Sequence, residues 1–113
     1  MQMQFMDLGS ASKISLDGRL DTPGVDQIET RFTAGAVSPG KSAIVDFSAV
    51  TFISSMGIRM LIASARSMSL KQARMVIFGV QPLVMQTFEN AAIEQIIPVA
   101  ADEAQAMALL QPA

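Results

Sequence analysis

Two adjacent serines, Ser54 and Ser55, stand where the sequence changes from a strand pattern to a helix pattern. A serine hydroxyl at the start of a helix can accept a hydrogen bond from an unpaired backbone N–H, which stabilises the helix by about 1 kcal/mol. The same position suits a phosphate, because the free N–H groups and the helix dipole stabilise negative charge there. The residues alone therefore leave two interpretations open, a helix cap and a site of reversible phosphorylation.

A second candidate is the segment 35–42, GAVSPGKS, which matches the G-x-x-x-x-G-K-S pattern of phosphate-binding loops. Asp46 follows in an apolar stretch, where such proteins carry a magnesium-binding aspartate. That chemistry requires a loop that leaves a strand and opens a helix, so that helix N–H groups contact the phosphate. Here the predicted order is helix, loop, strand, and Pro39 has no N–H to donate. We interpret the segment as a surface loop.

Composition excludes most enzyme chemistry. The 113 residues include no Cys and no His, which rules out a thiol nucleophile, a Ser-His-Asp triad and the Cys/His zinc sites. The carboxylates that could act as acid or base are scattered without a close pair, among them Asp7, Asp17, Asp21, Asp26 and Asp46. We expect no catalytic residue, no cofactor and no metal ion, and a protein that is not an enzyme.

Charge and hydropathy limit the partners. Eight Lys and Arg residues against ten Asp and Glu give a net charge of −2, without a basic cluster, which argues against nucleic-acid binding. No apolar run approaches the roughly 20 residues needed to cross a bilayer, and the first eight residues lack the positive charge of a signal peptide. We expect a cytoplasmic protein that does not insert into a membrane.

The first elements follow from alternation and capping. Apolar and polar residues alternate in segments 1–8 and 14–20, which predicts an antiparallel hairpin. Thr22 followed by Pro23 predicts a helix start with Thr22 as the cap, and Gly35 is expected to end that helix. With half of the residues hydrophobic, the chain can bury a core, so a folded domain is expected.

The rest of the chain alternates strands and helices. Buried strands are predicted at 43–47 and 75–78, and a short last strand at 96–99. Helices are predicted after Gly57, from Pro82 with Leu83, Val84 and Phe88 on its apolar side, and after Asp102 as a cap. The order β-β-α-β-α-β-α-β-α predicts a single α/β domain over residues 1–113, with a mixed, mostly parallel sheet packed against helices.

Three stretches carry a resemblance to a known family. Residues 18–21, GRLD, are similar to a G-x-L-D motif at the end of a strand; residues 45–53, VDFSAVTFI, are similar to an apolar strand and its exit; residues 54–58, SSMGI, are similar to D-S-S/T-G-L. The chain thus resembles a STAS domain of the bacterial anti-sigma-factor antagonists over nearly its whole length. It departs at Ser54, where many members have Asp, and at Met56, where they have Ser, Thr or Ala.

The resemblance implies roles for specific residues. Ser55 matches the phosphoacceptor serine, and Asp21 matches an acidic residue near it that contributes to the partner surface. The expected partner-binding residues are Asp21, Ser54, Ser55, Met56, Gly57, Ile58 and Met60. The three large apolar side chains among them fall within two helical turns and cannot all face one side, so at least one should be exposed.

The resemblance also implies a function. Unphosphorylated protein would bind an anti-sigma factor of the serine-kinase type, phosphorylation of Ser55 would release it, and a serine phosphatase would reset this partner switch. An alternative is a STAS subunit of a membrane-associated complex, such as a lipid-transport ABC system, in which the domain is a constitutive protein contact. An enzymatic role is the third hypothesis, and the composition disfavours it.

Overall fold

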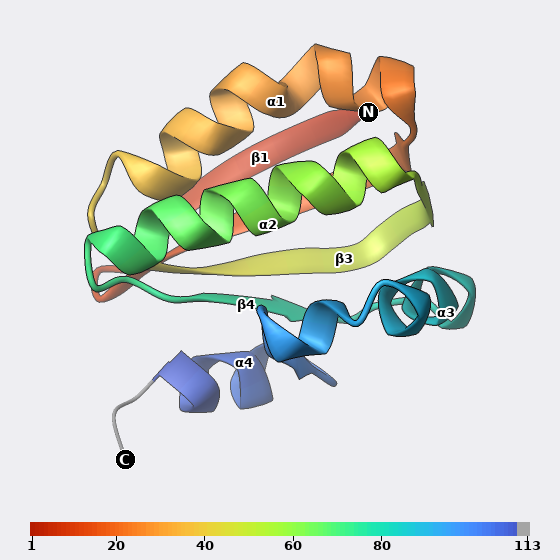
Figure 1. Ribbon diagram of the computed structural model, residues 1–113. Helices are drawn as coiled ribbons and strands as arrows, with labels where there is room; N and C mark the ends of the chain where they lie inside the picture. Colours follow the sequence, from red (N-terminus) through yellow and green to blue (C-terminus); the bar gives the residue numbers. More distant parts are fainter. Residues whose placement is uncertain (111–113) are drawn as a thin grey trace.

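The computed structural model describes residues 1–110 and contains one five-stranded sheet with helices on both faces (Figure 1). The elements in chain order are β1 (Gln2–Asp7), β2 (Ala11–Leu20), α1 (Thr22–Val37), β3 (Ser42–Ile53), α2 (Ser55–Leu70), β4 (Met75–Phe78), α3 (Pro82–Asn90), the 3-10 helix η1 (Ile93–Gln95), β5 (Val99–Ala100) and α4 (Glu103–Leu110). This order confirms the predicted α/β class and the predicted alternation.

The strands lie side by side in sequence order, from β1 to β5. β1 pairs with β2 in antiparallel fashion, as the alternation predicts, and the other three pairings are parallel. β3 pairs with β2 along its whole length, from Ser42 to Ile53, but with β4 only over Ala43–Asp46. The second half of β3 therefore extends beyond β4, and α2 begins at its tip.

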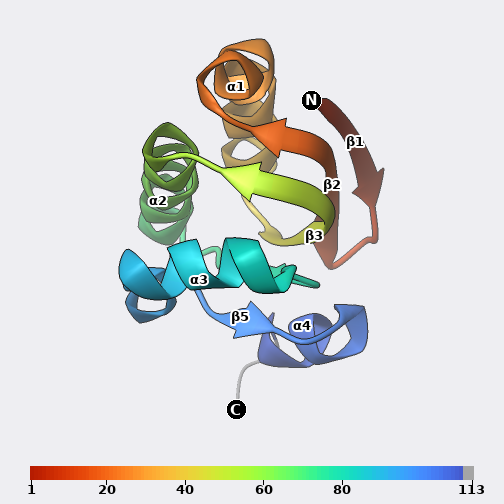
Figure 2. The same ribbon diagram turned by 90° about the vertical axis from the view of Figure 1, so that its right-hand side faces the viewer.

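The helices form unequal layers on the two faces of the sheet (Figure 2). α1, α2 and α3 cover one face and bury the main core, in which the rings of Phe47 and Phe88 lie 5.5 Å apart. α4 covers part of the other face, over a smaller apolar cluster that includes Ile44, Val76 and Phe78. The unequal cover leaves the far face of β1 and β2 open.

The prediction that Gly35 ends the first helix is wrong. α1 continues to Val37, and Gly35 lies inside it, where Phe5 of β1 packs against the helix. A Cβ at this position would overlap the Phe5 ring, so the glycine serves close approach of a strand rather than termination.

Two predictions for the last third of the chain are also wrong. Ile96 and Ile97 are not in a strand, since β5 contains only Val99 and Ala100. Ile93 and Ile97 are both fully buried and four residues apart, so the isoleucines follow a helical turn around η1. Leu83 does not belong to the apolar side of α3, because 65% of its surface is exposed. The predicted cap of α4 is confirmed, since Asp102 Oδ1 accepts a 2.8 Å hydrogen bond from the Gln105 N–H.

The segment with the phosphate-loop pattern connects a helix to a strand, as expected from the sequence. Its first three residues still belong to α1, and the strand begins at Ser42. The Lys41 ammonium contacts Asp7 Oδ1 at 2.5 Å and the Gly9 carbonyl at 3.2 Å. This lysine therefore ties the loop to the β1–β2 turn.

Candidate functional site

The candidate site lies where the carboxyl ends of β2 and β3 meet the first turns of α1 and α2 (Figure 2). The Leu20 carbonyl at the end of β2 accepts two hydrogen bonds from Ser54, from its N–H at 2.9 Å and from its hydroxyl at 3.1 Å. The Ser54 hydroxyl oxygen in turn accepts a 3.3 Å bond from the Gly57 N–H. Ser54 is thus the cap of α2 and fastens its start to the neighbouring strand.

Ser55 is the first residue of α2 and is exposed. Because the capping bond is made by Ser54, the Ser55 hydroxyl is not needed to start the helix. The structure therefore assigns the capping interpretation to Ser54. Ser54 has the structural role, and Ser55 presents a hydroxyl to solvent at the positive end of the helix dipole.

Gly57 allows the close packing that positions this turn. A Cβ added to it would lie 2.8 Å from Ile53 Cγ1 and 3.0 Å from both the Cγ and the carbonyl oxygen of Leu20. The first distance is shorter than Cβ atoms reach in real structures and the other two are tighter than most, so a side chain here would push α2 away from the strand ends. Gly57 is buried, and its part in the site is to set the position of Ser55.

Asp21 caps α1 beside this turn, which corrects the prediction that Thr22 is the cap. Its Oδ1 accepts a 2.9 Å bond from the Gly24 N–H, and its Oδ2 lies 3.4 Å from Arg19 Nε. The Arg19 guanidinium also lies over the Phe52 ring, 4.5 Å from its centre, and so links the ends of β2 and β3. Sequence reasoning overlooked this role of Arg19, although the residue lies inside the GRLD stretch.

The Asp21 cap makes stability depend on pH. The Gly24 N–H lowers the pKa of the Asp21 carboxyl, desolvation opposes this, and Arg19 adds to the lowering. A pKa below the unfolded value of about 3.9 means that the ionised cap stabilises the fold above that pH and that this contribution is lost as the pH falls through the folded-state pKa. We expect D21N, which keeps a capping oxygen but does not titrate, to lose less stability than the wild type between pH 5 and pH 2, roughly the range in which carboxyl groups titrate. Urea unfolding at several pH values measures this difference, and equal losses in both proteins would contradict it.

The three large apolar residues of the predicted contact set have different environments. Met56 is 37% exposed, which confirms that at least one of them faces solvent, whereas Ile58 is 9% exposed. Met60 is 2% exposed and belongs to the main core. The prediction that Met60 contributes to a contact surface is therefore wrong for this fold, because the helix turns its side chain toward the sheet.

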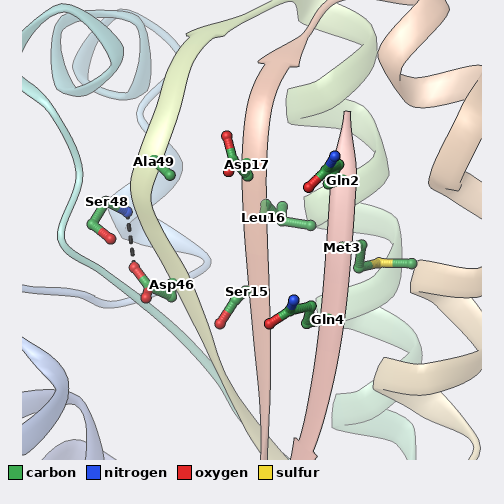
Figure 3. A pocket seen from close by; sticks show the side chains of 9 residues that line it. All are labelled: Gln2, Met3, Gln4, Ser15, Leu16, Asp17, Asp46, Ser48 and Ala49. Carbon is green, nitrogen blue, oxygen red and sulfur yellow. Dashed lines mark hydrogen bonds between the residues drawn. The ribbon is translucent and has the colours of Figure 1, made fainter.

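A hollow on the open face of the sheet is lined mainly by polar side chains of the strands (Figure 3). Its polar lining comes from three neighbouring strands: Gln2, Gln4, Ser15, Asp17, Asp46 and Ser48. Asp46 Oδ1 accepts a 2.8 Å bond from the Ser48 N–H, at an irregularity in the β2–β3 pairing. Neither here nor elsewhere in residues 1–110 do three Asp or Glu side chains gather to hold a metal ion.

None of the helices in residues 1–110 combines the length and the apolar character required to cross a membrane.

Comparison with known proteins places this geometry in a family. The family model of the STAS domain matches residues 4–106. BtrV of Bordetella bronchiseptica, which carries the name of an anti-sigma factor antagonist, is 26% identical over 98 residues, or 87% of this chain and 84% of that protein.

Solved structures share the fold. The anti-sigma factor antagonist SpoIIAA of Bacillus, in its unphosphorylated form, aligns with a TM-score of 0.77 at 22% identity and covers 94% of this chain and 93% of its own. A Thermotoga maritima protein described as an anti-sigma factor antagonist aligns with a TM-score of 0.89 at 11% identity, over 97% of this chain and 95% of its own. The element order, the paired helix starts and the match over residues 4–106 lead to one conclusion: this chain belongs to the STAS domain family.

Proposed function

We propose that this chain is an anti-sigma factor antagonist that works in the cytoplasm as one component of a partner switch and catalyses no reaction itself. In its unphosphorylated form it binds an anti-sigma factor of the serine-kinase type, which phosphorylates Ser55, and a serine phosphatase restores the binding form. The observation that carries the proposal is the division of labour between the two serines, with Ser54 bonded to Leu20 and Gly57 and Ser55 exposed. Bacillus SpoIIAA, which has the same fold, has been solved in unphosphorylated and phosphorylated forms.

The surroundings of Ser55 explain how a phosphate would act. Phosphorylation adds about −1.5 to −2 charges at neutral pH. The first turn of α2 contains no acidic residue, so its free N–H groups can accommodate that charge without disturbing the helix. In a complex, the same phosphate would have to be stripped of water against the partner surface, beside the ionised Asp21. The cost falls on the complex and not on the fold, so release needs no large conformational change.

The test is phosphorylation by a serine-kinase anti-sigma factor of the same organism. The chain is incubated with each such kinase and ATP, and its intact mass is measured. We expect the mass to increase by one phosphoryl group in the wild type and in S54A, and to stay unchanged in S55A. A phosphoryl group that remains in S55A, or no mass increase with any of the kinases, contradicts the proposal. Constitutive co-purification with a transport ATPase, without phosphorylation, would instead favour the membrane-associated alternative.

A further inference from the structure

The charges of this chain are segregated along its sequence, and α2 lies at the centre of the positive part. Between Phe47 and Phe88 there is no Asp or Glu, and the cations of that segment are Arg59, Arg66, Lys71 and Arg74. All ten acidic residues lie outside it, although the chain as a whole has a net charge of −2. A positive segment in a protein of net negative charge suggests a contact with a negatively charged partner.

Two of these cations share the outward face of α2. Met56, Arg59, Ala63, Arg66 and Leu70 follow one another at intervals of three and four residues, so they form one row along the helix, which we name the α2 stripe. All five are exposed, and Leu70 is 88% exposed. The stripe is about 21 Å long. Figure 1 shows α2 over the sheet with no other element on its outer side.

The stripe has the chemistry of a docking surface. Neither arginine takes part in an ion pair within residues 1–110. Ala63 lies between them, so another helix or strand could approach closely there, and exposed apolar side chains lie at both ends. Arginine is suited to pairing with carboxylates across an interface, because its planar guanidinium can bind two oxygens at once. An acidic surface of a protein, with apolar residues flanking its carboxylates, matches this arrangement in charge and in hydrophobicity.

We infer that the α2 stripe binds an acidic surface of the serine-kinase anti-sigma factor, with Arg59 and Arg66 pairing with its carboxylates. The inference rests on the proposed function and names the partner chemistry of that site. A lipid surface fits less well, because polybasic membrane-binding segments carry about four to eight cations and the stripe carries two.

The stripe also gives the phosphate a direct effect on binding. Ser55 lies four residues before Arg59, and side chains of a helix lean toward its N-terminus, so the Arg59 guanidinium can reach a phosphate on Ser55. The phosphate would then pair with the Arg59 guanidinium, which would no longer be available to the partner's carboxylate. Phosphorylation would thus both add a repelling charge and withdraw Arg59 from the interface.

The binding test uses the whole chain and the serine-kinase anti-sigma factor that phosphorylates it. We expect R59E and R66E each to weaken binding at least about tenfold, because like charges would then face each other across the interface. Binding of the wild type should weaken as salt is raised, since charge pairs at the surface are screened. R74E is the matched control, because Arg74 is exposed and precedes β4 at the opposite end of the sheet from Ser55. It should bind within about twofold of the wild type.

The outcomes separate the inference from the proposed function. If R66E binds as R74E does while Ser55 is still phosphorylated, the stripe is not the docking surface and the partner switch stands. If the wild type instead sediments with phosphatidylserine vesicles, or self-associates, and R66E does not, the occupant is a membrane or a second copy, and the inference is overturned. A second readout needs no partner: with phosphoserine incorporated genetically at position 55, R59A should raise the second phosphate pKa by a few tenths of a pH unit in a phosphorus NMR titration. An unchanged value would contradict the contact with Arg59.

Discussion

Replacing Ser55 by aspartate is expected to weaken binding to the serine-kinase anti-sigma factor at least about a hundredfold, because a negative charge at this position would lose its water in the interface. The domain should stay folded. A carboxylate in the first turn of a helix stabilises it by about 0.3–1 kcal/mol, and α2 has no other acidic residue there. Isothermal titration calorimetry measures the affinity, and a thermal melt followed by circular dichroism should show a melting temperature equal to or above that of the wild type.

The control for net charge is S10D. Ser10 is exposed in the turn between β1 and β2, at the end of the sheet away from Ser55. It receives the same change in charge and should bind as the wild type does. Binding by S55D at wild-type affinity would remove the basis of the switch. A genetically incorporated phosphoserine at position 55 repeats the experiment with the full charge of the modification, so a carboxylate that imitates phosphate poorly cannot hide the result.

Replacing Gly57 by valine is expected to destabilise the domain by about 3 kcal/mol, the upper range for overpacking a rigid site. Its Cβ would meet Ile53, at 2.8 Å, and two atoms of Leu20, one of them in the backbone. The Leu20 carbonyl accepts both bonds from Ser54, so pushing Leu20 away from α2 would stretch them. Urea unfolding measures the loss, and phosphorylation of Ser55 in the folded fraction should slow because the acceptor turn is displaced.

G35V is the matched control for this substitution. Gly35 is also inside a helix, but the atoms that a Cβ would meet there belong to the ring of Phe5, which is 47% exposed and can rotate toward solvent. Its loss of stability should be clearly smaller than that of G57V. Equal losses in the two variants would mean that the junction at Leu20 is no tighter than an ordinary helix–strand contact.

Hydrophobic patterns predicted the elements of this fold well where residues close in the sequence determined them. The hairpin, the two buried strands and the long helix after Gly57 follow from alternation and from an apolar row, which depend on neighbours in the sequence. The patterns failed where a distant residue decided. In the sequence Gly35 indicates a helix end, but in the structure it lies inside α1 and Phe5 packs against it. Ile96 and Ile97 indicate a strand in the sequence, but the turn of η1 buries Ile97 beside Ile93 and leaves Ile96 exposed.

The roles of the site residues were equally hard to predict where they depend on residues from other elements. Two adjacent serines are equivalent candidates for a cap. Ser54 has that role because its hydroxyl accepts from the Gly57 N–H, and it also donates to the Leu20 carbonyl of another strand, a contact that the sequence does not predict. Thr22 and Asp21 compete in the same way, and Asp21 caps because its carboxylate meets the Gly24 N–H. Met60 follows a helical row that the sequence can count but whose rotation relative to the sheet it does not fix. The roles of Ser55 and of the α2 stripe remain predictions for the experiments above.

The pair of hydrogen bonds that holds the Ser54 hydroxyl has a consequence for the information this protein can carry. Because Ser54 is engaged in the cap, the proposed switch has one phosphorylation site, and each molecule is either phosphorylated or unphosphorylated. A single phosphorylation site has no built-in threshold, so the phosphorylated fraction of the protein follows the ratio of kinase to phosphatase activity smoothly. Any sharp, all-or-none response in the cell would then have to arise in the enzymes that write and erase the mark, or in the competition for the partner, and not in this domain.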